Sequence, residues 1–329
     1  MLKNWSKEHS DKFSKETILY GHGLAETGLF TDDALIKLMN KHPVDQMDVC
    51  SMTENPDPQY PNEFITGDFR GVPAATLLDA AKAGRVFINL RKAMNIHEEY
   101  KVLLDQMFGE LAEKTGFAGF KPKGGILISS PISQTPYHFD KTETILWHIR
   151  GKKRIYIYPM TQDFIADKDY ETVALSHRID DLPYNESFDA AAGIYDLGPG
   201  EAISWPLNAP HRVDNGSFCV SVTTEYSTRE CVIKNNNMIA NAALRRKFGL
   251  SPQYDKDGKI KRYAKFGLGK MLQKTGYIDR NEVPDVVEFT IGKVRTKMTD
   301  VTVALTKEQF HTLNCRQRIF ALRGDVVVQ

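Results

Sequence analysis

The sequence predicts a mainly β fold with helical additions at both ends. Runs of β-prone residues separated by Gly- and Pro-containing turns fill the middle of the chain, whereas helical periodicity dominates the flanking regions. The clearest β-prone runs are Ile145 to Ile149, Ile155 to Tyr158 and Phe218 to Tyr226. With 329 residues, 41% of them hydrophobic, the chain can form one large domain or two.

Three helices and one strand are expected in the N-terminal third. Thr31 can cap a helix that ends before Pro43, and a second helix covers Pro73 to Ala83. The run Arg85 to Leu90 alternates as a strand does. A long amphipathic helix follows from about Ile96 to Lys114, and we expect it to pack on the outside of the β core. Its apolar side contains Val102, Leu103, Met107 and Leu111.

The central region predicts a buried strand followed by a hairpin. Gly124 to Ser130 is the buried strand, and it leads into the stretch Gln134 to Pro159. Within that stretch, the first two β-prone runs are joined by the turn Arg150 to Lys153, which contains a glycine. We therefore expect the second run to return beside the first as its neighbouring strand.

A histidine and an aspartate stand two residues apart in this stretch, at His138 and Asp140. In a strand, side chains at this spacing leave the same face, so one metal ion can bind to both. An imidazole and a carboxylate together suit Fe(II), Mn(II) or Zn(II). Such a triplet also occurs by chance in many proteins, so a metal site requires a third ligand.

The segment Gly198 to His211 supplies a candidate for that ligand. It has the form of a turn, a short strand, a proline-held bend and a histidine. His211 follows His138 by 73 residues, which suits a ligand from a later strand of the same barrel. Two histidines and one carboxylate leave three positions of an octahedron open, which is the facial arrangement of non-haem Fe(II) oxygenases.

Side-chain alternation places further residues beside this candidate site. Counted from Asp140, it puts Thr144, Leu146 and His148 on the side of the metal. Lys153 follows the turn, and if it projects into the same cavity it is a cation in an enclosed space. A buried cation requires a counter-charge. The pattern therefore favours an anionic cosubstrate.

Together, the stretches Thr135 to Pro159 and Pro199 to His211 resemble the JmjC branch of the cupin superfamily. They are similar to the asparaginyl hydroxylase that modifies hypoxia-inducible factor and to bacterial JmjC-like proteins. That group carries a Thr-Pro-x-His-x-Asp run, a Gly-x-Lys-Arg turn before a strand ending in Pro, and a Pro-Gly-Asp segment followed by Pro and His. The matching positions here are Thr135, Pro136, His138, Asp140, Gly151, Lys153, Arg154, Pro159, Pro199, Gly200, Pro206 and His211.

The resemblance implies a double-stranded β-helix, or jelly-roll, core over residues 85-228. An N-terminal helical and loop region, residues 1-84, would pack on it, and a mostly helical extension, residues 229-329, is a candidate dimer or partner surface. The resemblance also implies a set of site residues. His138, Asp140 and His211 would hold Fe(II), Lys153 and Thr135 would bind the distal carboxylate of 2-oxoglutarate, and Thr144 is a further candidate for the cosubstrate site.

The implied activity is that of a dioxygenase that hydroxylates a C–H bond while 2-oxoglutarate is decarboxylated to succinate. The substrate stays open between a peptide or protein side chain and a small metabolite, and so does desaturation or demethylation as the outcome. Thr144 and His148 replace an Asn and a Gln of the related hydroxylase, and Glu201 stands where Asp is commoner. Two alternatives stay open. A cupin isomerase or hydrolase would not need Lys153, and a non-enzymatic binding or regulatory protein would lack at least one metal ligand or the lysine.

Composition indicates which partners and which cellular location to expect. There are 43 basic and 42 acidic residues, a formal net charge of +1, so the overall charge does not favour a nucleic-acid partner. The four cysteines lack paired spacing, and the N-terminus lacks an apolar signal region. No apolar run approaches the roughly 20 residues of a membrane span. These features favour a cytoplasmic protein that does not enter a membrane.

The C-terminal region has a different character from the core. A helix is expected over Asn235 to Phe248. After it, six basic residues without an intervening acid lie between Lys259 and Lys274. Such a run forms either a surface for an anionic partner or a solvated helix face. Sequence alone favours the solvated face.

Overall fold

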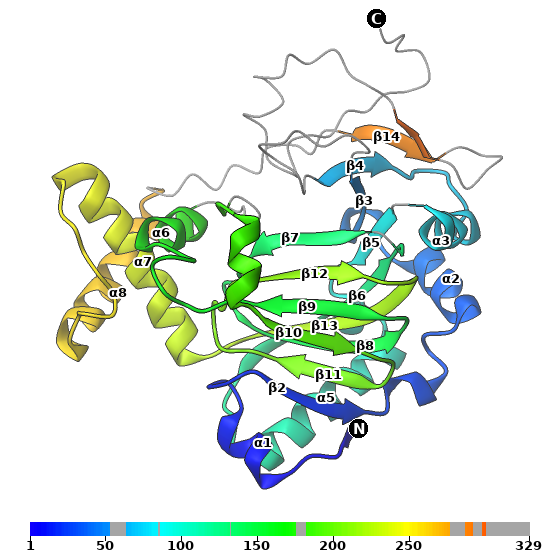
Figure 1. Ribbon diagram of the computed structural model, residues 1–329, viewed down its shortest axis with the longest axis horizontal. Coiled ribbons are helices and arrows are strands. Elements are labelled where there is room, and N and C mark those ends of the chain that lie inside the picture. The colour runs from blue at the N-terminus through cyan, green and yellow to red at the C-terminus, as the bar shows by residue number, and fades with distance from the viewer. Residues whose placement is uncertain are drawn as a thin grey trace, which may run out of the picture.

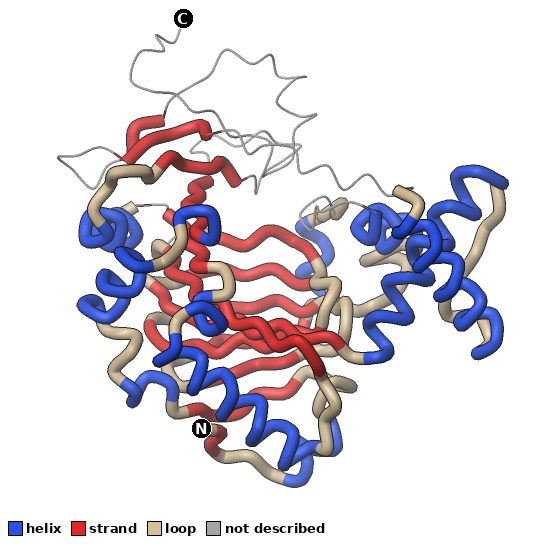
Figure 2. The backbone as a smooth tube through the Cα atoms, turned by 180° about the vertical axis from the view of Figure 1, so that it is seen from behind, coloured by secondary structure: helices blue, strands red, loops and turns tan. Residues whose placement is uncertain are grey.

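Two β-sheets pack against each other at the centre of the protein, and helices lie outside them (Figures 1 and 2). The computed structural model describes residues 1–52, 64–84, 86–131, 133–175, 182–276, 287–291 and 298–300. None of the described helices combines the length and the apolar character needed to cross a bilayer.

The larger sheet is eleven-stranded and mostly antiparallel, and it includes strands from both ends of the chain. In spatial order its strands are β1 (Leu2–Lys3), β2 (Ile18–His22), β11 (Glu201–Ser204), β8 (Glu143–Arg150), β13 (Cys219–Ser227), β6 (Phe120–Ser129), β5 (Val86–Leu90), β3 (Met47–Met52), β4 (Phe64–Asp68), β14 (Val287–Ile291) and β15 (Met298–Asp300).

The smaller sheet is four-stranded and antiparallel. In spatial order its strands are β10 (Gly193–Leu197), β9 (Lys153–Ile157), β12 (His211–Asn215) and β7 (Gln134–His138). The consecutive strands β6 to β13 divide equally between the sheets, with β6, β8, β11 and β13 in the larger one. Two four-stranded antiparallel sheets wound in this way form a jelly roll. The predicted double-stranded β-helix core with helical additions is thus confirmed.

The helices lie on the outer face of the larger sheet and at one end of the molecule (Figure 2). Their bounds are α1 (Lys7–Lys12), α2 (Asp32–Lys41), α3 (Ala74–Ala83), α4 (Ala93–Ile96), α5 (Glu98–Thr115), α6 (Asp167–Leu175), α7 (Arg229–Phe248) and α8 (Lys259–Lys274), with short 3-10 turns at Leu24–Thr27, Val44–Gln46 and Glu186–Ala191. As expected, Thr31 caps α2 by accepting a hydrogen bond from the amide of Ala34.

Alternate side chains of strand β8 pack into two different hydrophobic cores. Ile145, Trp147 and Ile149 pack in the large core between the outer face of the larger sheet and the helices. Leu146 points the other way and packs with Ile155 and other residues between the two sheets. The predicted inward face of β8 is therefore observed, and burial of both faces explains why apolar residues stand at consecutive positions in this strand.

Three expectations need correction. The turn after Arg150 does not close a hairpin, because β11 and β13 occupy both edges of β8 and β9 belongs to the other sheet. Val102 on α5 is 58% exposed, because the buried stripe of this helix runs through Leu104 instead. The first 84 residues are not only helices and loops, since β1 to β4 join the larger sheet. The boundaries at residues 84 and 228 stay a prediction.

The turn between the sheets depends on Gly151. Its φ is +95°, and a Cβ at this position would lie 2.2 Å from the carbonyl oxygen of Phe218. We expect Gly151→Ala to lower the free energy of unfolding by about 3 kcal/mol, measured by urea denaturation. Gly28 is the matched control, because its φ is +74° and a Cβ there would meet nothing within 4 Å. Gly28→Ala should cost only about 1 kcal/mol, and equal losses in the two variants would contradict the steric argument.

Candidate metal centre

Two histidines face each other across neighbouring strands of the smaller sheet. His138 ends β7, His211 begins β12, and the two residues are direct cross-strand partners with ring centroids 4.2 Å apart. Asp140 follows His138 by two residues and brings a carboxylate oxygen to 3.6 Å from Nε2 of His211. One ligand atom from each of the three residues lies within 4.8 Å of the others. The structure therefore brings together the three residues that sequence reasoning chose.

Hydrogen bonds fix the orientation of both imidazoles. Nδ1 of His138 lies 2.7 Å from the carbonyl oxygen of Pro136, and Nδ1 of His211 lies 3.0 Å from that of Ala209. A carbonyl oxygen can only accept, so Nδ1 carries the proton in each ring. Nε2 is then left with its lone pair, as a metal ligand requires.

Burial favours the neutral form of His211, which is the form that binds a metal. His138 and His211 are only 6% and 3% exposed. Desolvation, followed by the neighbouring His138, lowers the pKa of His211 to about 4, although the charge of Asp140 acts in the opposite direction. A neutral imidazole binds a metal without first losing a proton.

Surrounding residues hold the ligands in place. Asn208 donates a hydrogen bond of 2.6 Å from Nδ2 to the backbone oxygen of Asp140, which fixes the loop carrying that carboxylate. Trp205 lies with its ring centroid 4.5 Å from that of His211. Two imidazoles and one carboxylate suit Fe(II), Mn(II) or Zn(II), whereas Ca²⁺ and Mg²⁺ prefer oxygen ligands. The donor set therefore fits the iron implied by the sequence.

Lys153 is a buried cation in the same interior. It begins β9, is 4% exposed, and its ammonium donates a hydrogen bond of 2.7 Å to Oδ1 of Asn215. Burial lowers its pKa from the ordinary lysine value. Among the residues that the structure describes, no carboxylate lies within ion-pair distance of Lys153. A buried positive charge of this kind calls for an anionic ligand.

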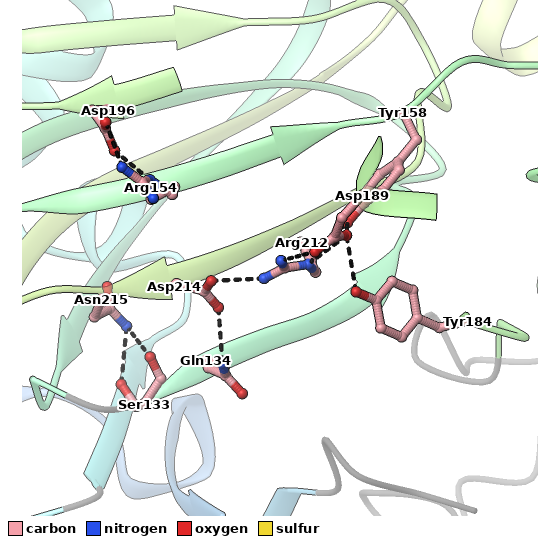
Figure 3. Close-up of polar contacts among 10 residues, drawn as sticks. All are labelled: Ser133, Gln134, Arg154, Tyr158, Tyr184, Asp189, Asp196, Arg212, Asp214 and Asn215. Atoms are coloured by element: carbon pink, nitrogen blue, oxygen red, sulfur yellow. Dashed lines mark hydrogen bonds and ion pairs between the residues drawn. The ribbon is translucent and has the colours of Figure 1, made fainter. Parts of the chain in front are cut away.

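Asn215 is itself held in one orientation. Its Nδ2 donates to the backbone oxygen of Ser133 at 2.6 Å and to the Ser133 hydroxyl at 3.0 Å, as Figure 3 shows. Both donors of the amide are thus used on one side, and Oδ1 has to face Lys153. This network leaves the remaining N–H groups of the ammonium available to a carboxylate.

The metal ligands and the lysine share one face of the smaller sheet. Along β12, His211, Val213 and Asn215 are buried, whereas Arg212 and Asp214 point to the other face, where Arg212 donates hydrogen bonds to Asp189 and Asp214 (Figure 3). Val213 packs between the sheets, so the buried set faces the interior. His211 and Asn215 are four residues apart, or ~13 Å along the strand. The metal ligands and the cation therefore lie toward opposite ends of the interior between the two sheets.

The other two predicted cosubstrate residues also face this space. Thr135 on β7 pairs with Val213 across the sheet, and Thr144 is buried on the same face of β8 as Leu146. The Oγ1 of Thr144 donates only a long hydrogen bond, 3.4 Å, to the backbone oxygen of Thr142. Contact of either threonine with a cosubstrate stays a prediction.

Sequence reasoning missed several residues of the site. Asn215 stands four residues after His211, so counting alternate positions along β12 could have found it. Glu225 on β13 pairs with Thr144 across the sheet, and burial together with the charge of Asp140 raises its pKa. Ser133 and Asn208 act from loops, where no periodic signal exists.

No family model and no curated protein matches the sequence. Solved structures of Escherichia coli YcfD are similar. An X-ray structure of this protein has a TM-score of 0.49, 15% identity, and covers 86% of this chain and 70% of that one. Two further structures are described as a ribosomal oxygenase with cobalt and 2-oxoglutarate or with cobalt and succinic acid, and each has a TM-score of 0.47, 14% identity, and coverage of 86% and 69%.

A buried carboxyl group lies close to the metal loop. Glu143 begins β8, three residues after Asp140, and its Oε1 accepts a hydrogen bond of 3.3 Å from the Thr228 hydroxyl. Its Oε2 is buried without a protein hydrogen-bond partner. Burial raises the pKa of Glu143 to about 7, so a large share of this carboxyl group is protonated in the folded protein at neutral pH.

The raised pKa of Glu143 makes the free energy of unfolding depend on pH. Because its pKa is higher in the folded state, its stabilising contribution is present below the unfolded pKa of ~4.3 and is lost as the pH rises through about 7. We expect Glu143→Gln to raise the free energy of unfolding by about 1 to 3 kcal/mol at pH 8 and to change it little at pH 4. The measurement is urea denaturation across this range. The exposed Glu113 is the control, and an equal gain from Glu113→Gln would refute the assignment.

Proposed function

We propose that the protein is an Fe(II)- and 2-oxoglutarate-dependent dioxygenase that hydroxylates a C–H bond of a peptide or protein side chain or of a small metabolite. One observation carries this proposal. A cluster of two histidines and one carboxylate faces the same interior between two sheets as a buried lysine, which has no carboxylate partner among the described residues. A metal with open positions and an anion-binding group are the two features that 2-oxoglutarate needs.

Each residue of the site has its own role in this proposal. His138, Asp140 and His211 would hold Fe(II), and bound iron, with 2-oxoglutarate and dioxygen, supplies the oxidising chemistry while the keto acid is converted to succinate. Lys153 and Thr135 would bind the distal carboxylate, and Thr144 would line the cosubstrate site. The enclosing sheets exclude water, which strengthens the attraction between the ammonium and the carboxylate.

The charge of Lys153 argues against the alternative of a metal-dependent isomerase or hydrolase. Such an enzyme would use the three ligands and leave a buried ammonium without a role. Burying an uncompensated charge costs several kcal/mol. A dicarboxylate cosubstrate gives that charge a function.

Anaerobic titration of the Fe(II)-loaded protein with 2-oxoglutarate tests the proposal. Chelation of iron by the keto acid should give a weak absorption band near ~500 nm. His138→Ala should lose iron, whereas Lys153→Ala should keep iron and need at least about tenfold more 2-oxoglutarate for half of the band. Lys152→Ala, one residue earlier and exposed, is the matched control. Metal binding without the band would favour the isomerase or hydrolase.

Asn215 provides a second, sharper test. Asn215→Asp keeps the shape of the side chain but places a carboxylate beside the Lys153 ammonium, where Oδ1 of Asn215 lies now. The internal ion pair would compete with the cosubstrate and repel its charge. We expect iron binding to be unchanged and the half-saturating 2-oxoglutarate concentration in the same titration to rise about tenfold or more. An unchanged value would remove Lys153 from the cosubstrate site.

A further inference from the structure

One face of helix α8 is packed, and the opposite face is exposed, with no neighbour among the residues that the structure describes. On the packed face, the backbone oxygen of Arg262 accepts a hydrogen bond of 2.9 Å from Asn237 of α7, and Gln273 donates one of 2.8 Å to Asn236. Lys265 pairs with the buried Asp257. Figures 1 and 2 show α8 beside α7 at one edge of the molecule, away from both sheets.

The opposite face carries an apolar line that we call the α8 seam. It consists of Ile260, Ala264, Gly267 and Met271, all exposed. Ile260 is 89% exposed and Met271 54%. The spacing of four, three and four residues is that of a helix that packs against another helix. Ala264 and Gly267 in the middle would let a second helix approach closely.

The surroundings of the seam are strongly basic. Residues 245 to 276 contain ten basic and two acidic side chains, a net charge of +8, although the whole chain has a net charge of only +1. Helical geometry places Lys259, Lys270 and Lys274 along one flank of the seam. In the described part of the chain, none of these three flanking lysines forms an ion pair, and the nearby Asp257 is bound by Lys261 and Lys265.

We propose that the α8 seam and its flanking lysines are a docking surface for an acidic amphipathic helix of a partner protein. Apolar side chains of that helix would pack on the seam, and its carboxylates would meet the three lysines. This inference is independent of the proposed enzyme activity.

Charge and shape disfavour other occupants. A second copy of the chain would bring two sets of lysines together, and like charges facing each other repel. Nucleic acid would use the lysines but not the exposed Ile260 and Met271. A lipid surface would gain little, because binding scales with buried apolar area and half of the seam is Ala and Gly.

Fluorescence anisotropy with a designed peptide tests this surface. The labelled probe is a three-heptad helix with Leu at the seam-facing positions and Glu beside them, and its control is a peptide of the same composition in scrambled order. The full-length protein should bind the probe at least about tenfold more tightly than the scrambled peptide. Met271→Asp should remove this preference. Val102→Asp, at a similarly exposed position on α5, should retain it.

A charge swap makes the test specific. The variant with Lys259→Glu, Lys270→Glu and Lys274→Glu should lose the Glu peptide and gain a peptide with Lys in place of Glu, while its thermal unfolding stays unchanged. Equal binding of the scrambled peptide would overturn the proposal. So would a dimer by light scattering that Met271→Asp turns into a monomer. Tighter binding of a 20-nucleotide RNA or of phosphatidylserine vesicles, lost in the charge variant, would assign the surface to that ligand instead.

Discussion

The antiparallel pairing of β7 with β12 is the constraint on which the candidate site depends. It sets His138 directly opposite His211, and alternation along β12 then carries the same face to Asn215. The adjoining pairing of β12 with β9 sets Lys153 opposite Asn215. A slip of one residue in either pairing would turn the ligands or the lysine out of the interior. Site geometry and sheet register are therefore one property of the fold.

Much of the site could be predicted because its signals are local. The spacing of His138 and Asp140, the later His211 and the lysine after a glycine turn are all readable along the chain. The pairing of strands is not local. The turn at Gly151 looks the same whether it closes a hairpin or crosses between sheets, and only the occupation of both edges of β8 by β11 and β13 decides. Sequence reasoning therefore assigned Lys153 correctly to the interior but gave β9 the wrong neighbour.

The residues that were missed share a physical reason. Ser133 and Asn208 act through hydrogen bonds from loops, and their roles depend on where distant segments meet. Glu225 is close to Asp140 only because β13 lies beside β8. Helix α5 shows the same limit in the core, since the apolar Val102 faces solvent while Leu104 is buried. A helix can carry more apolar residues than fit on its contact face, and the neighbouring elements determine which of them are buried.

The behaviour of the charged side chains in this protein depends on their burial as well as on their number. Between or beside the sheets, burial affects the Lys153 ammonium and the Glu143 carboxyl group, whose pKa it raises to about 7. In the basic segment around α8, the lysines other than Lys265 are exposed to water, where each costs little. The net charge of +1 averages over these two environments and describes neither. The buried Lys153 requires an anionic ligand because its charge is removed from water. The exposed lysines of α8 would bind an acidic partner together with the apolar side chains beside them.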